Sequence, residues 1–402
     1  MEYIEGGVCA PKGFVAGGIN CGIRNHEKRD LALIVSRTPA SAAGVYTQNL
    51  VKGAPITVTQ KHIEDGYARA IICNSGNANT CNPNGVSIAE GMCELVEMFT
   101  GIKQNDIIVA STGVIGQELK LEPIAYGMPD LMLSLGNHSD WAAEAIMTTD
   151  TFKKELAAKF MVGARPVKIG AIAKGSGMIC PNMATMLVFI TTDAKITPAM
   201  LQKALSDVVQ DSFNMISVDR DTSTNDMCIV LANGLAENEE IYEEGPRYEE
   251  FKTALLEICI QLAKSIAKDG EGATKLLECR VTGGKTQDDA RKIAKSIICS
   301  NLLKCAMFGS DANWGRVLCA IGYAGAETDV SKIAVTFKSA AGEVNVCRNG
   351  GAVEFSEELA KTVLSEDEII IDVALSDGSA AATAYGCDLS YDYVKINGDY
   401  RS

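Results

Sequence analysis

Several short stretches of the chain are runs of apolar residues that are rich in β-branched and aromatic side chains. Such runs carry no helical repeat and suit the pleated surface of a buried sheet. They predict strands at residues 70–73, 107–110, 167–173, 186–191, 228–232, 333–337 and 369–375. Sheets therefore dominate the predicted core.

Three stretches in the second half have apolar residues at helical spacing instead. Thr197 followed by Pro198 predicts the N-cap and first turn of one helix. A second helix is predicted to end at Lys268, and a third to begin at Thr286. Each has a single apolar stripe, so each is expected to cover one face of a sheet.

The length of 402 residues favours two domains or one large layered domain. The strongest boundary signals are the Gly-rich, Pro-broken loop before Thr185 and the acidic stretch at residues 237–250. The acidic stretch is expected to be a solvated surface.

Composition and charge narrow the classes of partner. Apolar residues make up 47% and charged residues 22%, as in a packed globular protein. The formal net charge is -14, so the field of the chain repels nucleic acids and anionic membranes. The sequence has neither a run of eighteen apolar residues nor a basic, apolar leader. We therefore expect a cytoplasmic protein that acts on a small molecule, without nucleic acid or membrane as partner.

Metal and histidine chemistry find little support in the residue pattern. The fourteen cysteines are scattered without metal-ligand spacing, and the three histidines lie in separate segments. Gly284, Lys285 and Thr286 precede a helix as in a phosphate-binding loop, but Cys279 stands where the leading glycine belongs. No metal site is predicted, and the cysteines are expected to be reduced thiols.

Thr185 is the candidate nucleophile. A threonine hydroxyl needs a base beside it, and an N-terminal threonine can use its own α-amine, which titrates near ~8. Attack of this hydroxyl on the carbonyl of Ala184 would cleave the Ala184–Thr185 bond and create such a terminus. From the residues alone, a structural threonine at a loop-to-strand junction is the alternative.

Glu271 is a second candidate, because it lies between two glycines. Little side-chain bulk obstructs a ligand there. The alternative is an ordinary helix C-cap with a solvated glutamate.

The segment KGSGMICPNMATML at residues 174–187 closely resembles the self-cleavage segment of the ornithine acetyltransferase family, also called glutamate N-acetyltransferase. The similarity extends along the whole chain. The further matching motifs are APKGF at 10–14, NSGNAN at 74–79, ASTGVIG at 110–116, TTDT at 148–151, DTSTND at 221–226, DGEGATK at 269–275, DANWGR at 311–316 and NGDYRS at 397–402.

The resemblance implies cleavage before Thr185 into an α chain of residues 1–184 and a β chain of residues 185–402. It implies that Thr185 is the nucleophile for both cleavage and acetyl transfer, with Thr112 and Gly113 as the oxyanion-hole pair. It also implies an α-β-β-α layered sandwich with an N-terminal threonine nucleophile, a smaller α/β domain, and an α2β2 assembly. The residue pattern alone predicts only a mixed α and β protein.

The resemblance also implies a set of substrate-binding residues. These are Thr148, Lys174, Thr185, Glu271, Asn397 and Ser402. Lys174 suits the α-carboxylate of an N-acetyl amino acid, and Glu271 suits the side-chain ammonium of ornithine. For Asn397 and Ser402 the alternative is a frayed terminus.

The implied function is ping-pong acetyl transfer in the cyclic pathway of arginine biosynthesis. Thr185 takes the acetyl group from N2-acetylornithine, ornithine leaves, and glutamate accepts the acetyl group as N-acetylglutamate. No metal or organic cofactor is expected, because the threonine carries the acyl group. Some family members also use acetyl-CoA as a donor, and no residue pattern here decides whether this chain does.

The chain departs from the family pattern at residues 80–83. It also departs at Arg220, a position where glycine is common in the family. Arg220 leaves the fine substrate specificity open. Two rival functions also remain open: an aminopeptidase or amidohydrolase on the same self-cleaving scaffold, and an uncleaved, non-catalytic binding homologue. Hydrolysis without an acceptor would indicate the first, and an intact chain with a dispensable Thr185 the second.

Overall fold

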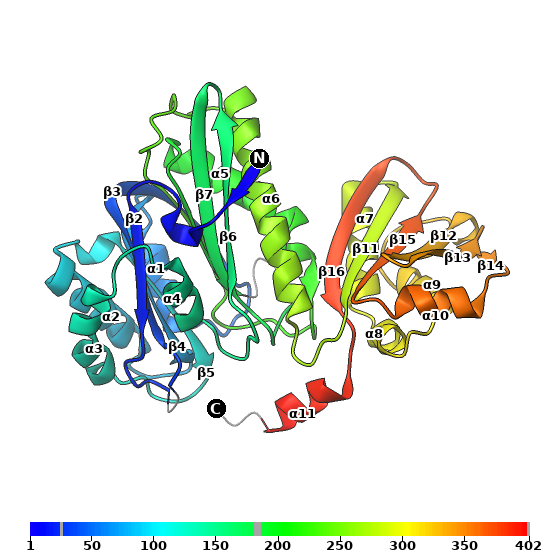
Figure 1. Cartoon of the computed structure of the whole chain (residues 1–402), viewed down its shortest axis with the longest axis horizontal. Coiled ribbons are helices and arrows are strands. Elements are labelled where there is room, and N and C mark those ends of the chain that lie inside the picture. The colour runs from blue at the N-terminus through cyan, green and yellow to red at the C-terminus, as the bar shows by residue number, and fades with distance from the viewer. Residues whose placement is uncertain (25–26, 181–185, 400–402) are drawn as a thin grey trace.

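Two bodies make up the molecule, and each is built around one mixed sheet (Figure 1). The structure is a computed structural model that describes residues 1–24, 27–180 and 186–399. Parallel and antiparallel strand pairs occur in both sheets. The prediction of a mixed α and β protein is therefore confirmed.

The larger body contains a nine-stranded sheet in the order β1-β6-β7-β8-β10-β3-β4-β5, with β2 paired to β3. Its strands are β1 (Glu2–Ile4), β2 (Phe14–Ile19), β3 (Leu31–Tyr46), β4 (Tyr67–Asn77), β5 (Ile107–Val114), β6 (Lys154–Val162), β7 (Arg165–Lys174), β8 (Leu187–Thr192) and β10 (Met227–Ala232).

Strand β3 divides this sheet into two halves, because its register with β4 shifts between Val35 and Ala40. The first part of β3 pairs with β2 and β4, and the second part pairs with β10. Apolar side chains from both halves, among them Ile34, Ile71 and Phe189, form one buried cluster. The two halves therefore pack against each other.

Helices cover the outer side of each half. Helices α5 (Pro198–Val208) and α6 (Pro246–Lys268) share a buried cluster with β6, β7, β8 and β10. Helices α2 (Gly85–Thr100) and α3 (Glu122–Leu133) share another with β3, β4 and β5, next to α1 (Ala54–His62). Helix α4 (Ser139–Ala145) contributes to the cluster between the halves. Burial of one apolar face per element explains this layering.

The smaller body has a seven-stranded sheet in the order β14-β13-β12-β15-β11-β16-β9. Its strands are β9 (Ile216–Ser217), β11 (Leu276–Gly284), β12 (Ala334–Ser339), β13 (Gly342–Arg348), β14 (Gly351–Ala352), β15 (Glu368–Ala374) and β16 (Ala380–Cys387). Its helices are α7 (Gln287–Ile298), α8 (Asn301–Phe308), α9 (Trp314–Gly322) and α10 (Glu357–Leu364). These elements bury a cluster of their own.

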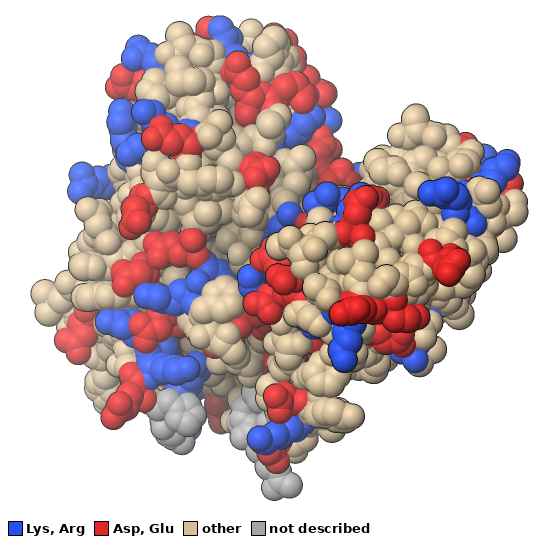
Figure 2. All heavy atoms as spheres, turned by 45° about the vertical axis from the view of Figure 1, so that its right-hand side comes forward, with Lys and Arg blue, Asp and Glu red and all other residues tan. Residues whose placement is uncertain are grey.

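Helix α11 (Tyr391–Asp399) follows β16 and lies below the junction of the two bodies (Figure 1). Acidic and basic side chains are interspersed over the face shown in Figure 2. No helix in the described part of the chain is long and apolar enough to cross a membrane.

All seven predicted strands and all three predicted helices are confirmed. Their predicted ends agree to within two residues, except that β4 extends three residues before and four after the predicted run and β5 extends four residues beyond it. Thr197 accepts a hydrogen bond from the Met200 N–H and caps α5, and Thr286 caps α7 through the Asp289 N–H. The four helices of the first half were not predicted. The acidic stretch is largely exposed, as expected.

One boundary prediction is wrong. The loop before Thr185 does not separate two folding units, because the strands on its two sides are neighbours in one sheet. Lys174 at the end of β7 pairs with Leu187 at the start of β8. The change from the larger to the smaller body instead follows α6, where β11 begins at Leu276.

Candidate active site

Thr112 and Gly113 lie at the end of β5, beside the parallel strand β4. Gly113 has a φ of 130°, and a Cβ at this position would lie 2.4 Å from the carbonyl carbon of Gly76. An L side chain is excluded both by that backbone conformation and by the contact. The close approach of the two glycines therefore fixes the path of the backbone at Thr112.

Buried amides from two motifs hold this turn in place. Asn74 Oδ1 accepts a hydrogen bond of 2.5 Å from Ser111 Oγ. Asn225 Nδ2 donates to the carbonyl oxygen of Ser111 at 3.0 Å and to that of Ala78 at 2.5 Å. Such satisfied buried networks are rigid, so the NSGNAN and DTSTND motifs position the neighbouring Thr112.

Lys174 reaches Thr112 from the end of β7. Its Nζ donates to Thr112 Oγ1 at 3.2 Å. Burial lowers the pKa of Lys174 from its ordinary value, while Asp150 and Asp226 act in the opposite direction. The hydroxyl of Thr112 therefore lies next to a buried amine.

Asp226 is a site residue to which the sequence analysis assigned no role. Burial raises its pKa well above the usual range, against a hydrogen bond from Ser223 and the charge of Lys174. Its Oδ2 atom is buried and has no hydrogen-bond partner among the described residues. Strongly shifted carboxyl groups of this kind are concentrated at functional sites. A carboxylate directly before the wholly buried strand β10 was the signal available in the sequence.

A buried ion network connects the loops around this centre. Lys154 Nζ lies 2.7 Å from Asp150 Oδ1 and 2.5 Å from Asp269 Oδ2, and the side chains of all three are almost fully buried. Asp150 also accepts hydrogen bonds from the N–H groups of Thr148, at 3.0 Å, and Gly175, at 2.7 Å. Burial alone would raise the pKa of Asp150, but Lys154, Lys174 and these hydrogen bonds lower it to about 2. The network joins the TTDT, KGSG and DGEG segments.

Glu271 is turned into the site from the loop after α6. Its N–H donates to the carbonyl oxygen of Ser176 at 3.2 Å, and its side chain lies against Gly177, where a Cβ would meet Oε1 at 2.5 Å. Only 9% of the residue is exposed. The alternative of a solvated C-cap glutamate is therefore wrong.

Helix α11 is seated on the same loop. Asn397 Nδ2 donates to Glu271 Oε2 at 2.8 Å, and Ser390 Oγ donates to the carbonyl oxygen of Gly272. A Cβ at Gly272 would lie 2.5 Å from the N atom of Tyr393. The alternative of a frayed terminus is therefore wrong for Asn397.

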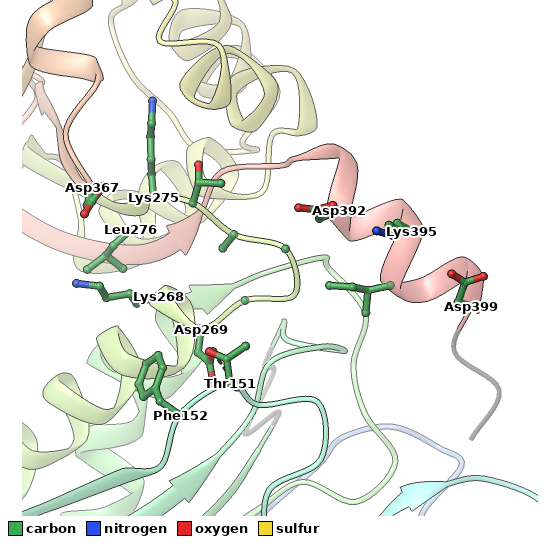
Figure 3. Close-up of a pocket in the computed structure, with 15 residues that line it drawn as sticks. Thr151, Phe152, Lys268, Asp269, Lys275, Leu276, Asp367, Asp392, Lys395 and Asp399 are labelled. Carbon is green, nitrogen blue, oxygen red and sulfur yellow. Dashed lines mark hydrogen bonds between the residues drawn. The ribbon is translucent and has the colours of Figure 1, made fainter.

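Two cavities border these residues. A small one is lined by Thr112, Lys174, Gly177 and Asp226, together with Met186. A wider cleft of about 700 Å³ lies beneath α11, whose Asp392, Lys395 and Asp399 border it opposite Thr151 and Asp269 (Figure 3).

The structure thus brings most of the predicted residues into one region. Thr112 contacts Lys174, Glu271 contacts Asn397, and Thr148 joins them through the ion network. Ala184, Thr185 and Ser402 lie outside the described residues, so the roles assigned to them stay predictions. Met186, the next residue after Thr185, borders the small cavity.

Comparison with known proteins shows the family of the chain. The model of the ArgJ family matches residues 15–402. The arginine biosynthesis bifunctional protein ArgJ of Caldanaerobacter subterraneus subsp. tengcongensis is 50% identical over 404 residues, and the match covers 100% of both chains.

Two solved structures are also similar. The arginine biosynthesis bifunctional protein argJ of Bacillus halodurans is 47% identical, with a TM-score of 0.51, and the match covers 53% of this chain and 98% of that chain. The ornithine acetyltransferase of Mycobacterium tuberculosis, complexed with ornithine, is 36% identical, with a TM-score of 0.41, and the match covers 45% of this chain and 98% of that chain.

The fold and the site are those of an acyl-transferring enzyme, with a hydroxyl, a backbone turn and a buried amine around one cavity. The chain belongs to the ArgJ family. It is a bifunctional acetyltransferase of arginine biosynthesis, so the predicted family and enzyme class are confirmed.

The ion network predicts a large loss of stability for Lys154→Met. The substitution leaves two buried carboxylates without their cation, which costs about 3–5 kcal/mol of unfolding free energy. Lys154 holds the pKa of Asp150 low, and its loss raises that pKa, so the deficit shrinks as the pH falls. Urea unfolding at several pH values measures both effects.

Lys153→Met is the matched control. Lys153 pairs with Asp140 at 3.6 Å, and both side chains are nearly half exposed. An exposed pair of this kind contributes less than about 1 kcal/mol. Equal losses for the two variants would show that the buried network does not stabilise the fold.

Proposed function

We propose that Thr185 cleaves the chain after Ala184 and then carries the acetyl group between two substrates. The small cavity is the observation that supports this proposal most directly, because Met186 and Thr112 line it together. A nucleophile one residue earlier then meets the donors that both reactions need. Self-cleavage gives an α chain of residues 1–184 and a β chain of residues 185–402.

The oxyanion is held by the Thr112 hydroxyl and the Gly113 N–H. Both reactions pass through a tetrahedral intermediate with a negatively charged oxygen, and fixed donors aimed at that oxygen are usually the largest catalytic contribution. The glycine contact and the buried amides already hold this turn rigidly. The donors therefore need no reorganisation when the charge develops.

The cleaved chains remain one folded unit in this proposal. Strand β7 belongs to the α chain and β8 to the β chain, and their pairing extends from Ile169–Thr192 to Lys174–Leu187. We also infer that the larger body is the α-β-β-α sandwich with an N-terminal threonine nucleophile, and that two such pairs assemble as α2β2.

The enzyme acts as ornithine acetyltransferase and glutamate N-acetyltransferase. The Thr185 hydroxyl attacks the acetyl carbonyl of N2-acetylornithine, its own α-amine takes the proton, and ornithine leaves after receiving that proton. The α-amine of glutamate then attacks the acetyl-threonine, and N-acetylglutamate leaves. Thr185 carries the acetyl group between the two substrates, so this chemistry needs no cofactor.

The charged residues suit these substrates. Lys174 is placed for the α-carboxylate, and Glu271 with Asn397 for the side-chain ammonium of ornithine. Thr148 and Ser402 complete the proposed binding set. Acetyl-CoA as an additional donor, and a cytoplasmic location, remain predictions.

Intact mass tests the nucleophile. Purified wild-type protein is expected as two fragments divided between Ala184 and Thr185, and Thr185→Ala as one uncleaved chain. Addition of N2-acetylornithine without glutamate is expected to add one acetyl group to the fragment that begins at Thr185. An uncleaved wild-type chain without adduct would support the non-catalytic homologue, and acetate release without an acceptor would support a hydrolase.

Thr112→Val tests the oxyanion hole. The substitution keeps the shape of the side chain but removes the hydroxyl donor, so cleavage and acetyl transfer should each slow by about a hundredfold or more. Thr112→Ser keeps the hydroxyl and should stay within a few-fold of wild type. Single-turnover rates measure the effect, and equal rates for the Val and Ser variants would refute the role of the hydroxyl.

Glu271→Gln tests the substrate charges. Loss of the carboxylate should raise KM for N2-acetylornithine by about tenfold to a hundredfold, because hydrogen bonds to charged groups contribute roughly 1.5–3 kcal/mol. KM for glutamate, which lacks the side-chain ammonium, should change far less. Glu368→Gln, at an exposed ion pair, is the matched control. A proportional change in both KM values would count against the assignment.

A further inference from the structure

Two cysteines from distant parts of the chain meet at one cavity. Cys180 and Cys299 both line a cavity of about 620 Å³. The two thiols interact there, and each shifts the pKa of the other. Both residues are half-buried rather than enclosed in the core. The cavity therefore gives a small reagent access to a pair of adjacent thiols.

Cys180 is held at the end of a short strap, residues 178–180. Ile179 N–H donates to Asp219 Oδ1 at 2.9 Å. Thr222 Oγ1 donates to the carbonyl oxygen of Cys180 at 3.0 Å. These contacts fix the approach of Cys180 to the smaller body.

Cys299 is the C-cap of α7, one helical turn after Lys295. Lys295 Nζ donates to the carbonyl oxygens of Asn214, at 2.7 Å, and Ile216, at 2.5 Å. This anchoring holds an ammonium group beside the two sulfur atoms. The charge of Lys295 opposes the effect of the helix C-terminus, which by itself disfavours a negative charge.

The described residues that line the cavity carry four cationic groups and no carboxylate. Two of them, Arg291 and Lys292, have carboxylate partners in Asp211 and Asp288. Arg220 adopts a positive φ of 73°, which explains why glycine suits this position.

A cationic environment favours a thiolate at Cys299. The hydrogen bond from Cys180 is the largest cause and, together with Lys295 and against burial, lowers the pKa of Cys299 to about 6. The same hydrogen bond raises the pKa of Cys180, which acts as the donor. One thiol is therefore a nucleophile at neutral pH, and its partner keeps its proton until the second step.

We propose that Cys180 and Cys299 form a reversible disulfide by exchange with a low-molecular-weight disulfide such as glutathione disulfide. The Cys299 thiolate attacks one sulfur atom of the reagent, forms a mixed disulfide and expels one thiolate. The Cys180 thiol then loses its proton, attacks the Cys299 sulfur atom and expels the second thiolate. The reagent is reduced to two thiols, and the two cysteines lose two electrons and two protons.

The bond has two consequences. It tethers the strap, whose Met178 and Ile179 also border the small active-site cavity, to the end of α7. It also joins the α and β chains covalently, because Cys180 precedes and Cys299 follows the proposed cleavage point. The second consequence rests on the proposed function, whereas the disulfide itself does not.

Peptide mapping tests the disulfide. The full-length protein is incubated with glutathione disulfide, blocked with N-ethylmaleimide and digested with trypsin without reduction. A peptide that begins at Gly175 should be linked to residues 296–304, in the wild type and in the matched control Cys305→Ser. Cys180→Ser and Cys299→Ser should each abolish the link. Separate blocking of both cysteines in the wild type, or glutathione on each, would overturn the proposal.

A non-reducing gel separates this proposal from self-cleavage. Oxidised wild type should migrate as one joined α–β species that reductant splits into two. A linked peptide in a protein that reductant leaves as one chain would confirm the disulfide and refute the cleavage. Two chains without a linked peptide would confirm the cleavage and refute the disulfide.

The pH dependence of cysteine labelling distinguishes an activated thiolate from a cysteine with only a packing role. Alkylation of Cys299 by iodoacetamide should be half-maximal near pH 6. Cys180→Ala removes the hydrogen bond and should shift this midpoint toward ~8.5, the value of an ordinary thiol. A wild-type midpoint already near ~8.5 would contradict an activated thiolate.

Discussion

The site depends on one buried cation, Lys154, which lies between Asp150 and Asp269. A buried carboxylate without a partner costs several kcal/mol, so the loops that carry these groups are stable only when they meet. Gly175 and Ser176 join the network through hydrogen bonds to Asp150 and to the Asp269 carbonyl oxygen. The TTDT, KGSG and DGEG segments are thereby joined into one rigid wall of the site, next to Thr112 and Glu271.

Glycines around this wall act as spacers where groups come too close for a side chain. Gly113 presses on Gly76, Gly177 makes room for the Glu271 carboxylate, and Gly272 makes room for α11. Each contact has a different effect: the first shapes the turn at Thr112, the second admits a charge, and the third seats helix α11. The glycine content of the family motifs is therefore a requirement of distance as well as of backbone conformation.

The proposed cleavage and the proposed disulfide act on the same short connection between β7 and β8. Sheet pairing keeps the two proposed chains together without a covalent bond, since Lys174 and Leu187 are cross-strand neighbours. The strap before the proposed cleavage point then carries the proposed bond from the α chain to the smaller body. Redox chemistry at Cys180 would therefore act on a wall of the active site as well as on the linkage between the chains.

The sequence by itself determined the seven strands that carry apolar runs, because buried strands need apolar residues, and the capped helices α5 and α7, because Thr197 and Thr286 supply local hydrogen bonds. It did not predict the remaining strands, such as β3, β6 and β16. It missed the first-half helices, where Gly91 and Pro129 lower helix propensity and tertiary packing compensates. Family motifs predicted Thr112, Gly113, Lys174, Glu271 and Asn397 as site residues. Only the tertiary structure decided that Glu271 is buried, that Asp226 faces Lys174 and that Cys180 meets Cys299, because burial and charge depend on which distant loops come together.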